Sequence, residues 1–210
     1  INADNQEHKV TVAIVDITPE LQYFATPELE ENVYLQARCV NNSACPLLAT
    51  DAVSIFLDGS YVTKTHLKHT SPGEAFSVFL GVDPSVKISH KLMKRQTEMG
   101  SDGGAFKSKV PSRLTNEQRT LIHNTKSAAA IKLTLVQLLP RSDDARIVVD
   151  LLDPPPSSVQ TSKEHDADNS AGEGALKSGG IMQNAITNNV VFSRTLGPGE
   201  KLEVPFSFSI

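Results

Sequence analysis

Histidines are the first residues whose spacing could support chemistry. His66 and His69 are three positions apart, and on a helix this spacing would let both rings share a metal ion. The surrounding residues alternate as in a strand, where residues three apart point to opposite faces. Residues 164–168 (Glu-His-Asp-Ala-Asp) offer oxygen and imidazole ligands, but in a segment too polar to hold a rigid metal shell. We therefore predict no metal site and no cofactor.

Nucleophilic catalysis finds no support in the motifs. The chain has no Gly-x-Ser-x-Gly motif, and neither Cys39 nor Cys45 lies in the sequence context of a catalytic cysteine. Asp143 and Asp144 resemble the tip of a turn, whereas a carboxylate dyad needs acids that converge from different strands. The glycines of residues 100–104 lack the Gly-Lys-Ser/Thr ending of a phosphate loop and are typical of a linker. These patterns predict a protein that is not an enzyme.

Asp83 is the acid to test first. It precedes Pro84 at the end of a strand-like run, and an Asp in that position can point into a rim shared by several loops. Capping its own turn is the favoured interpretation.

Cysteine usage and composition restrict the protein class. Cys39 and Cys45 are the only cysteines; a short-loop disulfide between them is possible, but two thiols in a chain of this size favour a reduced, intracellular, cytoplasmic protein. The 210 residues are 39% hydrophobic, which excludes wholesale disorder. No apolar run approaches the ~20 residues that cross a bilayer. The chain begins at Ile1 without a leader, so we expect a piece of a longer protein.

Charge argues against nucleic acid as a partner. The formal net charge is -4 and the pI is about 5.9, whereas nucleic-acid binders carry a basic excess. Cations do gather around residues 93–113, but without aromatic residues to stack bases. A solvated face is the favoured interpretation of this cluster, and an anionic partner surface is the alternative. The cluster consists of Lys87, Lys91, Lys94, Arg95, Lys107, Lys109 and Arg113.

Apolar residues recur with a period of two, which predicts strands. The alternating runs are Val10–Ile14, Val33–Cys39, Ile131–Leu135 and Leu202–Ile210. Pro205 lies in the last run and cannot donate to a ladder, so this strand should be an edge or should turn the ring outward. Helix signals are weak throughout.

Turn residues support the strand assignment. Asp58-Gly59 predicts a hairpin that pairs Leu57 with Ser60, Phe56 with Tyr61 and Ile55 with Val62, covered on both faces. Pro72-Gly73 and Pro198-Gly199 predict turns that lead into strands.

A weak internal repeat suggests how the chain is organised. Ser71-Pro72-Gly73-Glu74 resembles Gly197-Pro198-Gly199-Glu200, and each copy lies downstream of a strand that ends in Asn, Asn41 or Asn124. The fold class predicted is therefore all-β, with two immunoglobulin-like β-sandwich modules in tandem favoured over one continuous sandwich. The expected boundaries are 1–92 and 114–210, with a flexible connection at 93–113 and a disordered insertion at 153–189.

An ordered set of motifs resembles a known family. It runs from Val53–Val62 through Ser71–Glu74 to Phe79–Lys87, with Pro46–Leu48 and His123–Lys126. The set is similar to the C-terminal domain of unknown function of the mucoidy-inhibitor-A-like proteins. The resemblance covers most of residues 8–152 and returns at 190–210, and it implies a longer chain with an N-terminal domain and a coiled coil. It implies no catalytic residues.

The turn motifs have a structural explanation that needs no active site, since they supply backbone angles that other residues resist. We therefore expect a non-enzymatic interaction or structural module whose partner is another protein or other domains of its own chain. A carbohydrate-binding sandwich and a hydrolase whose acids converge only in the fold are the alternatives. The structural turn residues are Asp58, Gly59, Pro72, Gly73, Asp83, Pro84, Pro198 and Gly199.

Overall fold

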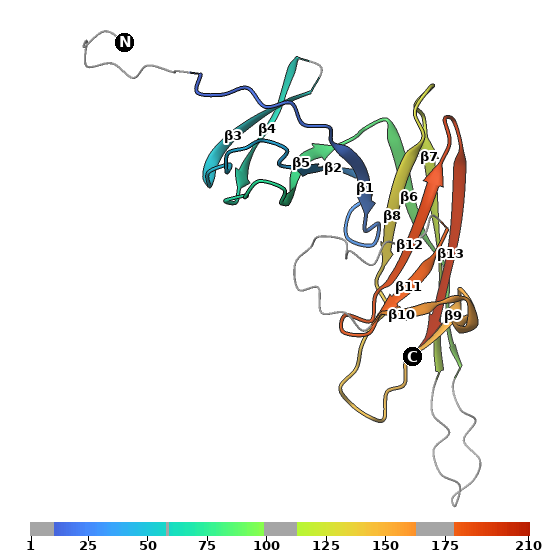
Figure 1. The fold of residues 1–210 in the computed structure, drawn as a ribbon. Coiled ribbons are helices and arrows are strands. Elements are labelled where there is room, and N and C mark those ends of the chain that lie inside the picture. The colour runs from blue at the N-terminus through green and yellow to red at the C-terminus, as the bar shows by residue number, and fades with distance from the viewer. Residues whose placement is uncertain (1–10, 58, 99–112, 163–178) are drawn as a thin grey trace, which may run out of the picture. The chain divides into compact units, whose positions relative to one another are not determined.

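The computed structural model describes residues 11–57, 59–98, 113–162 and 179–210. Within these ranges the chain forms strands and one short 3₁₀ helix, without an α-helix, so the all-β prediction is confirmed (Figure 1). None of the helical turns in the described ranges has the length and hydrophobicity of a membrane span. The elements are β1 (Glu20–Ala25), β2 (Tyr34–Val40), β3 (Thr50–Leu57), β4 (Ser60–Leu67), β5 (Ala75–Val82), β6 (Val86–Glu98), β7 (Arg113–Asn124), β8 (Ile131–Gln137), β9 (Asp150–Asp153), η1 (Pro156–Ser158), β10 (Gln160–Ser162), β11 (Ile181–Asn184), β12 (Val190–Leu196) and β13 (Lys201–Ser209).

The strands form three sheets. One has the order β10-β11-β12-β8-β1-β2-β5, the second has the order β6-β7-β13-β9, and the third is the hairpin β3-β4. The chain divides into two compact units: Ile1–Glu20 with Ala37–Val78, and Leu21–Gln36 with Phe79–Ile210.

A β-sandwich core fills the second unit. Alternate residues of β1, β2, β8 and β12 face those of β6, β7, β9 and β13, as expected for two packed sheets (Figure 1). Burial of each large side chain contributes about 1.5–3 kcal/mol relative to exposure. The alternating runs predicted from Val33, Ile131 and Leu202 onward all supply core residues. The buried apolar side chains are Tyr23, Ala25, Val33, Leu35, Val86, Ile122, Ile131, Leu133, Leu135, Leu139, Leu151, Val190, Phe192, Leu196, Val204, Phe206 and Phe208.

Pro205 lies inside β13 without breaking its ladder. Leu114 and Ile210 exchange both backbone hydrogen bonds, at 2.9 Å each, so every second residue of β13 from Ile210 back to Leu202 turns its N–H toward β7. Pro205 is opposite Arg119 between these bonded pairs, and its nitrogen faces the other edge. The pairing of β13 with β9 begins only at Ser207. The ring thus faces outward, as predicted for a paired strand.

The first predicted strand is wrong. Val10 lies outside the described residues, and Val12 and Ile14 are 95% and 87% exposed in a segment without strand pairing. The chain instead enters the sheet at β1, where Tyr23 and Ala25 face the core. Alternation of apolar residues is not enough for a strand, because a strand also needs a partner edge and a core to cover.

The hairpin β3-β4 follows the predicted register only at its tip. Leu57 pairs with Ser60 and Phe56 with Tyr61, but a bulge places Ile55 opposite Thr63 rather than Val62. Phe56 and Tyr61 are 63% and 56% exposed, so the expected cover on both faces is wrong.

Two predicted irregular segments contain strands. Residues 93–98 end β6 and Arg113 begins β7, and these strands pair from Val86↔Asn124 to Glu98↔Arg113, so the described part of 93–113 is a hairpin stem. Within 153–189, β10 and β11 extend the edge of the seven-stranded sheet. The residues of β10 are polar, but Ile181 of β11 and Val159, which precedes β10, pack against the core. Residues 99–112 and 163–178 lie outside the described residues.

Candidate interaction surface

Asp83 lies at a junction of three turns in the second unit. Its carboxylate accepts hydrogen bonds from the N–H of Ser85 at 2.9 Å and from the Ser85 hydroxyl. The Lys126 ammonium is 2.7 Å from Asp83 Oδ2, and it also lies over the ring of Tyr23, 5.7 Å from its centroid. Burial alone would raise the pKa of Asp83, but the hydrogen bonds from Lys126 and Ser85 outweigh burial and lower this pKa.

The pKa values of Lys126 and Tyr23, which surround Asp83, are shifted as well. Burial lowers the pKa of Lys126, yet its bond to Asp83 outweighs this and raises it. Burial raises the pKa of Tyr23. A carboxylate this fully engaged, beside a lysine that stays charged, cannot act as a general base near neutral pH. Asp83 therefore caps the turn after β5 and ties it to the turn after β7.

Asn41 forms the first of two closely similar buried loop anchors. Asn41 is fully buried, and its amide donates to the carbonyls of Cys45 and Thr70 at 3.0 and 3.2 Å. Its backbone N–H donates to the carbonyl of Glu74, and the Glu74 carboxylate accepts from the N–H of Ser71 at 2.7 Å. Gly73, with φ of +81°, completes the turn.

Asn124 repeats this scheme. It is also fully buried, and its amide donates to the carbonyls of Leu196 and Gly197 at 3.3 and 2.9 Å. Its N–H donates to the carbonyl of Glu200, whose carboxylate accepts from the N–H of Gly197 at 2.6 Å. Gly199 has φ of +70°. The repeated residues noticed in the sequence therefore form the same three-part anchor twice, once in each unit.

The remaining turn residues have equally local roles. Gly59 has φ of +77°, whereas Asp58 lies outside the described residues. Gly81, with φ of +89°, bends the end of β5 just before Asp83. The N–H of Asp83 donates to the carbonyl of Val33 at 2.9 Å. These positions shape the backbone and bring no reactive groups together.

Metal-type and nucleophilic residues do not converge in the described part of the chain. No group of three His, Cys, Asp or Glu side chains there could hold a metal ion. His66 pairs with Asp51, and Asp144 pairs with Arg146, which lowers the pKa of Asp144. Residues 164–168 lie outside the described residues. Cys39 is buried and Cys45 exposed, both as free thiols.

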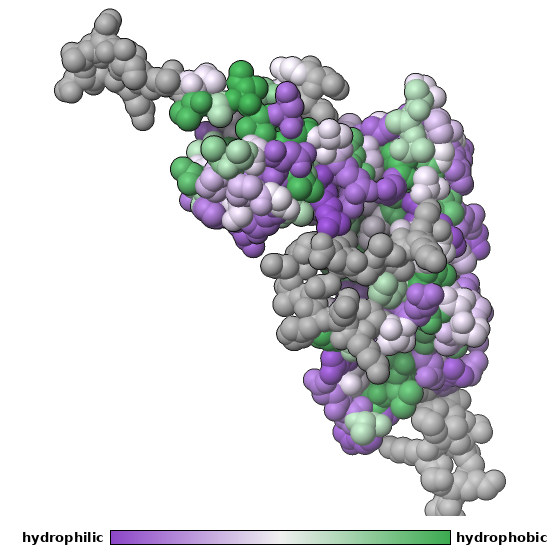
Figure 2. Space-filling view, viewed as in Figure 1, coloured by the Kyte–Doolittle hydropathy of each residue, from purple (hydrophilic) through white to green (hydrophobic). Residues whose placement is uncertain are grey.

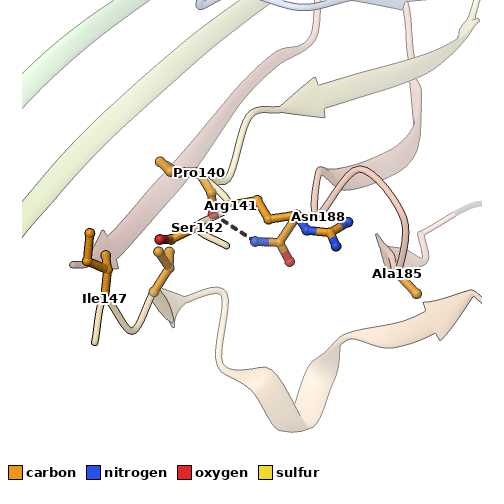
Figure 3. Close-up of a pocket in the computed structure, with 7 residues that line it drawn as sticks. Pro140, Arg141, Ser142, Ile147, Ala185 and Asn188 are labelled. Carbon is orange, nitrogen blue, oxygen red and sulfur yellow. Dashed lines mark hydrogen bonds between the residues drawn. The ribbon is translucent and has the colours of Figure 1, made fainter. Parts of the chain in front are cut away.

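A hollow of about 340 Å³ lies between the loops that follow β8 and β11 (Figure 3). Asn188, at φ of +66°, donates to the carbonyl of Pro140 at 2.8 Å, and Arg141 donates to the carbonyl of Ile186 at 2.7 Å. These bonds use the polar groups to tie one loop to the other. The lining residues, which also include Ser142, Ile147, Val149 and Ala185, contain no acid or histidine for proton transfer.

Buried polar residues interrupt one side of the sandwich core, and the sequence patterns missed them. Gln137 and Thr120 are fully buried, and the Gln137 amide donates to the Thr120 hydroxyl at 2.9 Å. His90 Nδ1 lies 3.0 Å from the same hydroxyl. The carboxylate of Glu28 accepts the N–H of Leu138 at 3.1 Å, and burial raises the pKa of Glu28 to about 7. The even-numbered face of β7 mixes Leu114 and Ile122 with four polar residues, Asn116, Gln118, Thr120 and Asn124, so a search for apolar alternation does not find this inward face.

The outer face of β6, β7 and β13 is the most distinctive exposed surface of the second unit. We call it the cationic face. Its centre is a hollow of about 220 Å³ lined by Leu121, Met93, Ser89, Lys91, Arg119 and Glu203. Leu121 and Met93 are 43% and 53% exposed. Charged side chains surround them: Lys87, Lys91, Lys94, Arg119 and Lys201, against Glu117 and Glu203.

Most of these cations have no partner in the part of the chain that the structure describes. Arg119 Nε lies 2.8 Å from Glu203 Oε1, whereas Lys87, Lys91 and Lys94 form no ion pair with any described residue. Elsewhere, in the view of Figure 2, hydrophobic residues of the second unit are scattered among hydrophilic ones. The sequence cluster of cations around 93–113 thus marked one edge of this face, but not the contributions of β7 and β13.

Comparison with known proteins places the chain in a family. It is 34% identical over 154 residues to Protein F37C4.5 of Caenorhabditis elegans, an alignment that covers 73% of this chain and 26% of that protein. The chain thus spans about a quarter of the length of this curated relative. No solved structure matches the chain. Neither the family description nor the relative's name assigns an enzymatic activity. Residues 1–210 match the model of a domain of unknown function, DUF4139, and the chain belongs to this family.

Proposed function

We propose that this chain is a non-enzymatic protein-interaction module of a longer protein, and that the cationic face is its binding surface. The observation that carries the proposal is the hollow around Leu121 and Met93, which leaves apolar side chains exposed within an ordered, three-stranded surface. An apolar centre with a polar rim is typical of protein-binding surfaces. Rigid strands also preorganise the surface, so that binding orders few side chains.

The polar residues that could do chemistry support a role other than catalysis. Asp83 is held by Ser85 and Lys126, and the hollow between the loops contains neither acid nor histidine. Preorganised nucleophile and base pairs are the usual sign of an active site. Within the described residues Asp83, His66 and Asp144 instead serve turns and ion pairs.

A carbohydrate-binding role is the second candidate, and one observation favours it. Phe56 and Tyr61 form an exposed pair at the tip of the hairpin β3-β4, with ring centroids 5.8 Å apart and planes at 72°. Sugar faces stack on aromatic rings, but this edge-on pair offers no flat row. Isothermal titration of oligosaccharides with the wild type and with Tyr61→Ala tests this candidate, and equal heats for both proteins would remove it.

The proposal also includes the domain organisation, the longer protein to which the chain belongs, and its compartment. Two immunoglobulin-like modules are supported by the two Asn anchors, one in each compact unit. Membership of the longer protein among the mucoidy-inhibitor-A-like proteins is supported by the ordered motifs from Val53 to Lys87. An intracellular compartment is supported by the two free thiols, Cys39 and Cys45. The partner is a protein or another domain of the same longer chain.

Affinity capture with the full-length protein tests the interaction function. We expect a partner that is retained by the wild type and lost both on deletion of this 210-residue segment and on the substitution Leu121→Asp. Leu48→Asp is the matched control, because Leu48 is an exposed leucine of the first unit. If deletion of the segment or Leu121→Asp changes nothing, the proposal is wrong.

A further inference from the structure

We infer that the cationic face binds an extended acidic segment of a partner protein, with one apolar side chain between two acidic ones. The inference rests on the proposed interaction function and specifies the chemistry of the partner. It follows from the order of residues across the three strands, which strand register fixes.

Strand pairing arranges the outward side chains in rows across the sheet. Lys87 is opposite His123, which is opposite Lys201. Two residues further along, Ser89, Leu121 and Glu203 form the next row. Lys91 is opposite Arg119 and then Pro205 in the third row. The apolar side chain of Leu121, flanked in its row by Ser89 and Glu203, therefore lies between two cationic rows.

These cationic rows are unfavourable for the fold itself. Like charges directly opposite each other on neighbouring strands destabilise a sheet, and Lys91 lies directly opposite Arg119. Arg119 has Glu203 as a partner at 2.8 Å, while Lys91 pairs with no described residue. The chain as a whole has a formal charge of -4, so the charge of the cationic face is opposite in sign to that of the whole chain. An anionic ligand would relieve the repulsion that the fold leaves in place.

Row spacing specifies the ligand further. Rows two residues apart on β7 are about 7 Å apart, and side chains two residues apart on any extended peptide have the same spacing and point to one side. A segment of the form acidic-x-apolar-x-acidic therefore places a carboxylate near each cationic row. Its apolar side chain then enters the hollow of about 220 Å³ beside Leu121 and Met93.

Other anionic ligands fit the surface less well. Bases of nucleic acids stack best on the rings of Phe, Tyr and Trp, and the outward residues of these rows include none of these, only the imidazole of His123. The flat array of headgroups on an anionic membrane would be repelled by the carboxylates of Glu203 and Glu117, which lie on the same face. A second copy of this chain would bring the same cations against the same rows. A peptide can place its carboxylates over the cations and avoid both glutamates.

Fluorescence anisotropy with the 210-residue chain tests the inference directly. The probe is a labelled peptide of repeated Glu-Ser-Leu-Ser-Glu units, and the comparison peptide carries Gln in place of every Glu. We expect the acidic peptide to bind at least about tenfold more tightly, and the double variant Lys87→Glu/Lys91→Glu to lose about tenfold in affinity. Lys64→Glu on β4 is the control for the same charge change and should bind as the wild type does. Binding should weaken as salt shortens the screening length below about 8 Å.

Several results would overturn the inference. One is equal affinity for the Glu and Gln peptides, and another is unchanged affinity of the double variant. Tighter binding of duplex DNA or of anionic phosphatidylserine vesicles than of the acidic peptide would assign the face to another class of ligand.

The same variants separate this inference from the proposed function. If the full-length protein keeps its partner with Lys87→Glu/Lys91→Glu but loses it with Leu121→Asp, the interaction module stands and the acidic partner is wrong. If neither variant changes capture, both are wrong.

Discussion

Glu28→Gln should make the protein more stable than the wild type at pH 8, with little difference at pH 5. Glu28 Oε2 accepts the N–H of Leu138, while its other oxygen is buried without a hydrogen-bond partner in the described structure. Burial raises the pKa of Glu28 from 4.5 to about 7, against a smaller lowering by the Leu138 hydrogen bond. Glutamine keeps an oxygen for Leu138 and carries no charge that must be desolvated.

The sign and size follow from linkage. Because the folded pKa lies above the unfolded one, the folded state binds the proton more tightly, and stability falls as pH rises from about 4.5 to about 7. The full shift in pKa corresponds to about 3 kcal/mol. Glu28 is only partly buried, so solvent screening reduces this to about 1–2 kcal/mol. Glu28→Gln should recover that amount above pH 7.

Urea unfolding followed by far-ultraviolet circular dichroism measures the effect, since the chain has no Trp. The quantity to compare is the difference in unfolding free energy between variant and wild type at pH 5 and at pH 8. Glu98→Gln, at the exposed end of β6, controls for the loss of one carboxylate. A difference for Glu28→Gln that is the same at both pH values would refute the reasoning.

Three further substitutions test the anchors and turns by urea unfolding. Asn124→Ala should lower the free energy of unfolding by about 3 kcal/mol, because it leaves buried carbonyls without donors. Asn32→Ala, at an exposed position, is the control. A loss below about 1 kcal/mol for Asn124→Ala would contradict the anchor role. Asp83→Asn should cost about 1–2 kcal/mol at pH 7. The pKa of Asp83 is lowered in the folded state, so this stabilisation is fully present above pH 3.8 and disappears as the pH falls further. An equal loss of stability in strong acid would contradict this explanation. Gly199→Ala should lower the free energy of unfolding by about 1 kcal/mol, because residue 199 has a φ of +70° that alanine adopts poorly. Gly199→Asn should lower it less, since Asn tolerates the left-handed region. The reverse order would contradict this conformational explanation.

Strands with one apolar face were predictable from the sequence. In β8 and β13 the alternating residues supply Leu133, Leu135, Phe206 and Phe208 to the core. Strand β7 was only partly predictable, because its inward face includes Asn116 and Thr120, whose burial depends on partners from other strands. The exposed Val12 shows the opposite case, alternation without a core to cover.

The cationic face was predictable only in part. Lys87 and Lys91 were noticed as a basic cluster, but nothing in the sequence places Arg119 and Lys201 in rows with them. Those rows depend on the register of β6, β7 and β13, which long-range pairing sets. The Asn anchors were noticeable as a repeat, whereas their hydrogen bonds required the fold.

The two anchors also differ in how much chain each one encloses. Asn41 reaches Thr70 across 29 positions, and Asn124 reaches Leu196 across 72. Closing the longer loop costs only about 0.8 kcal/mol more in chain entropy. In chain entropy alone, the connections between strands that the second anchor encloses can therefore gain or lose length at low cost, which makes them suitable for grafting a reporter domain. Homologues should differ in length there before they differ at the anchor itself.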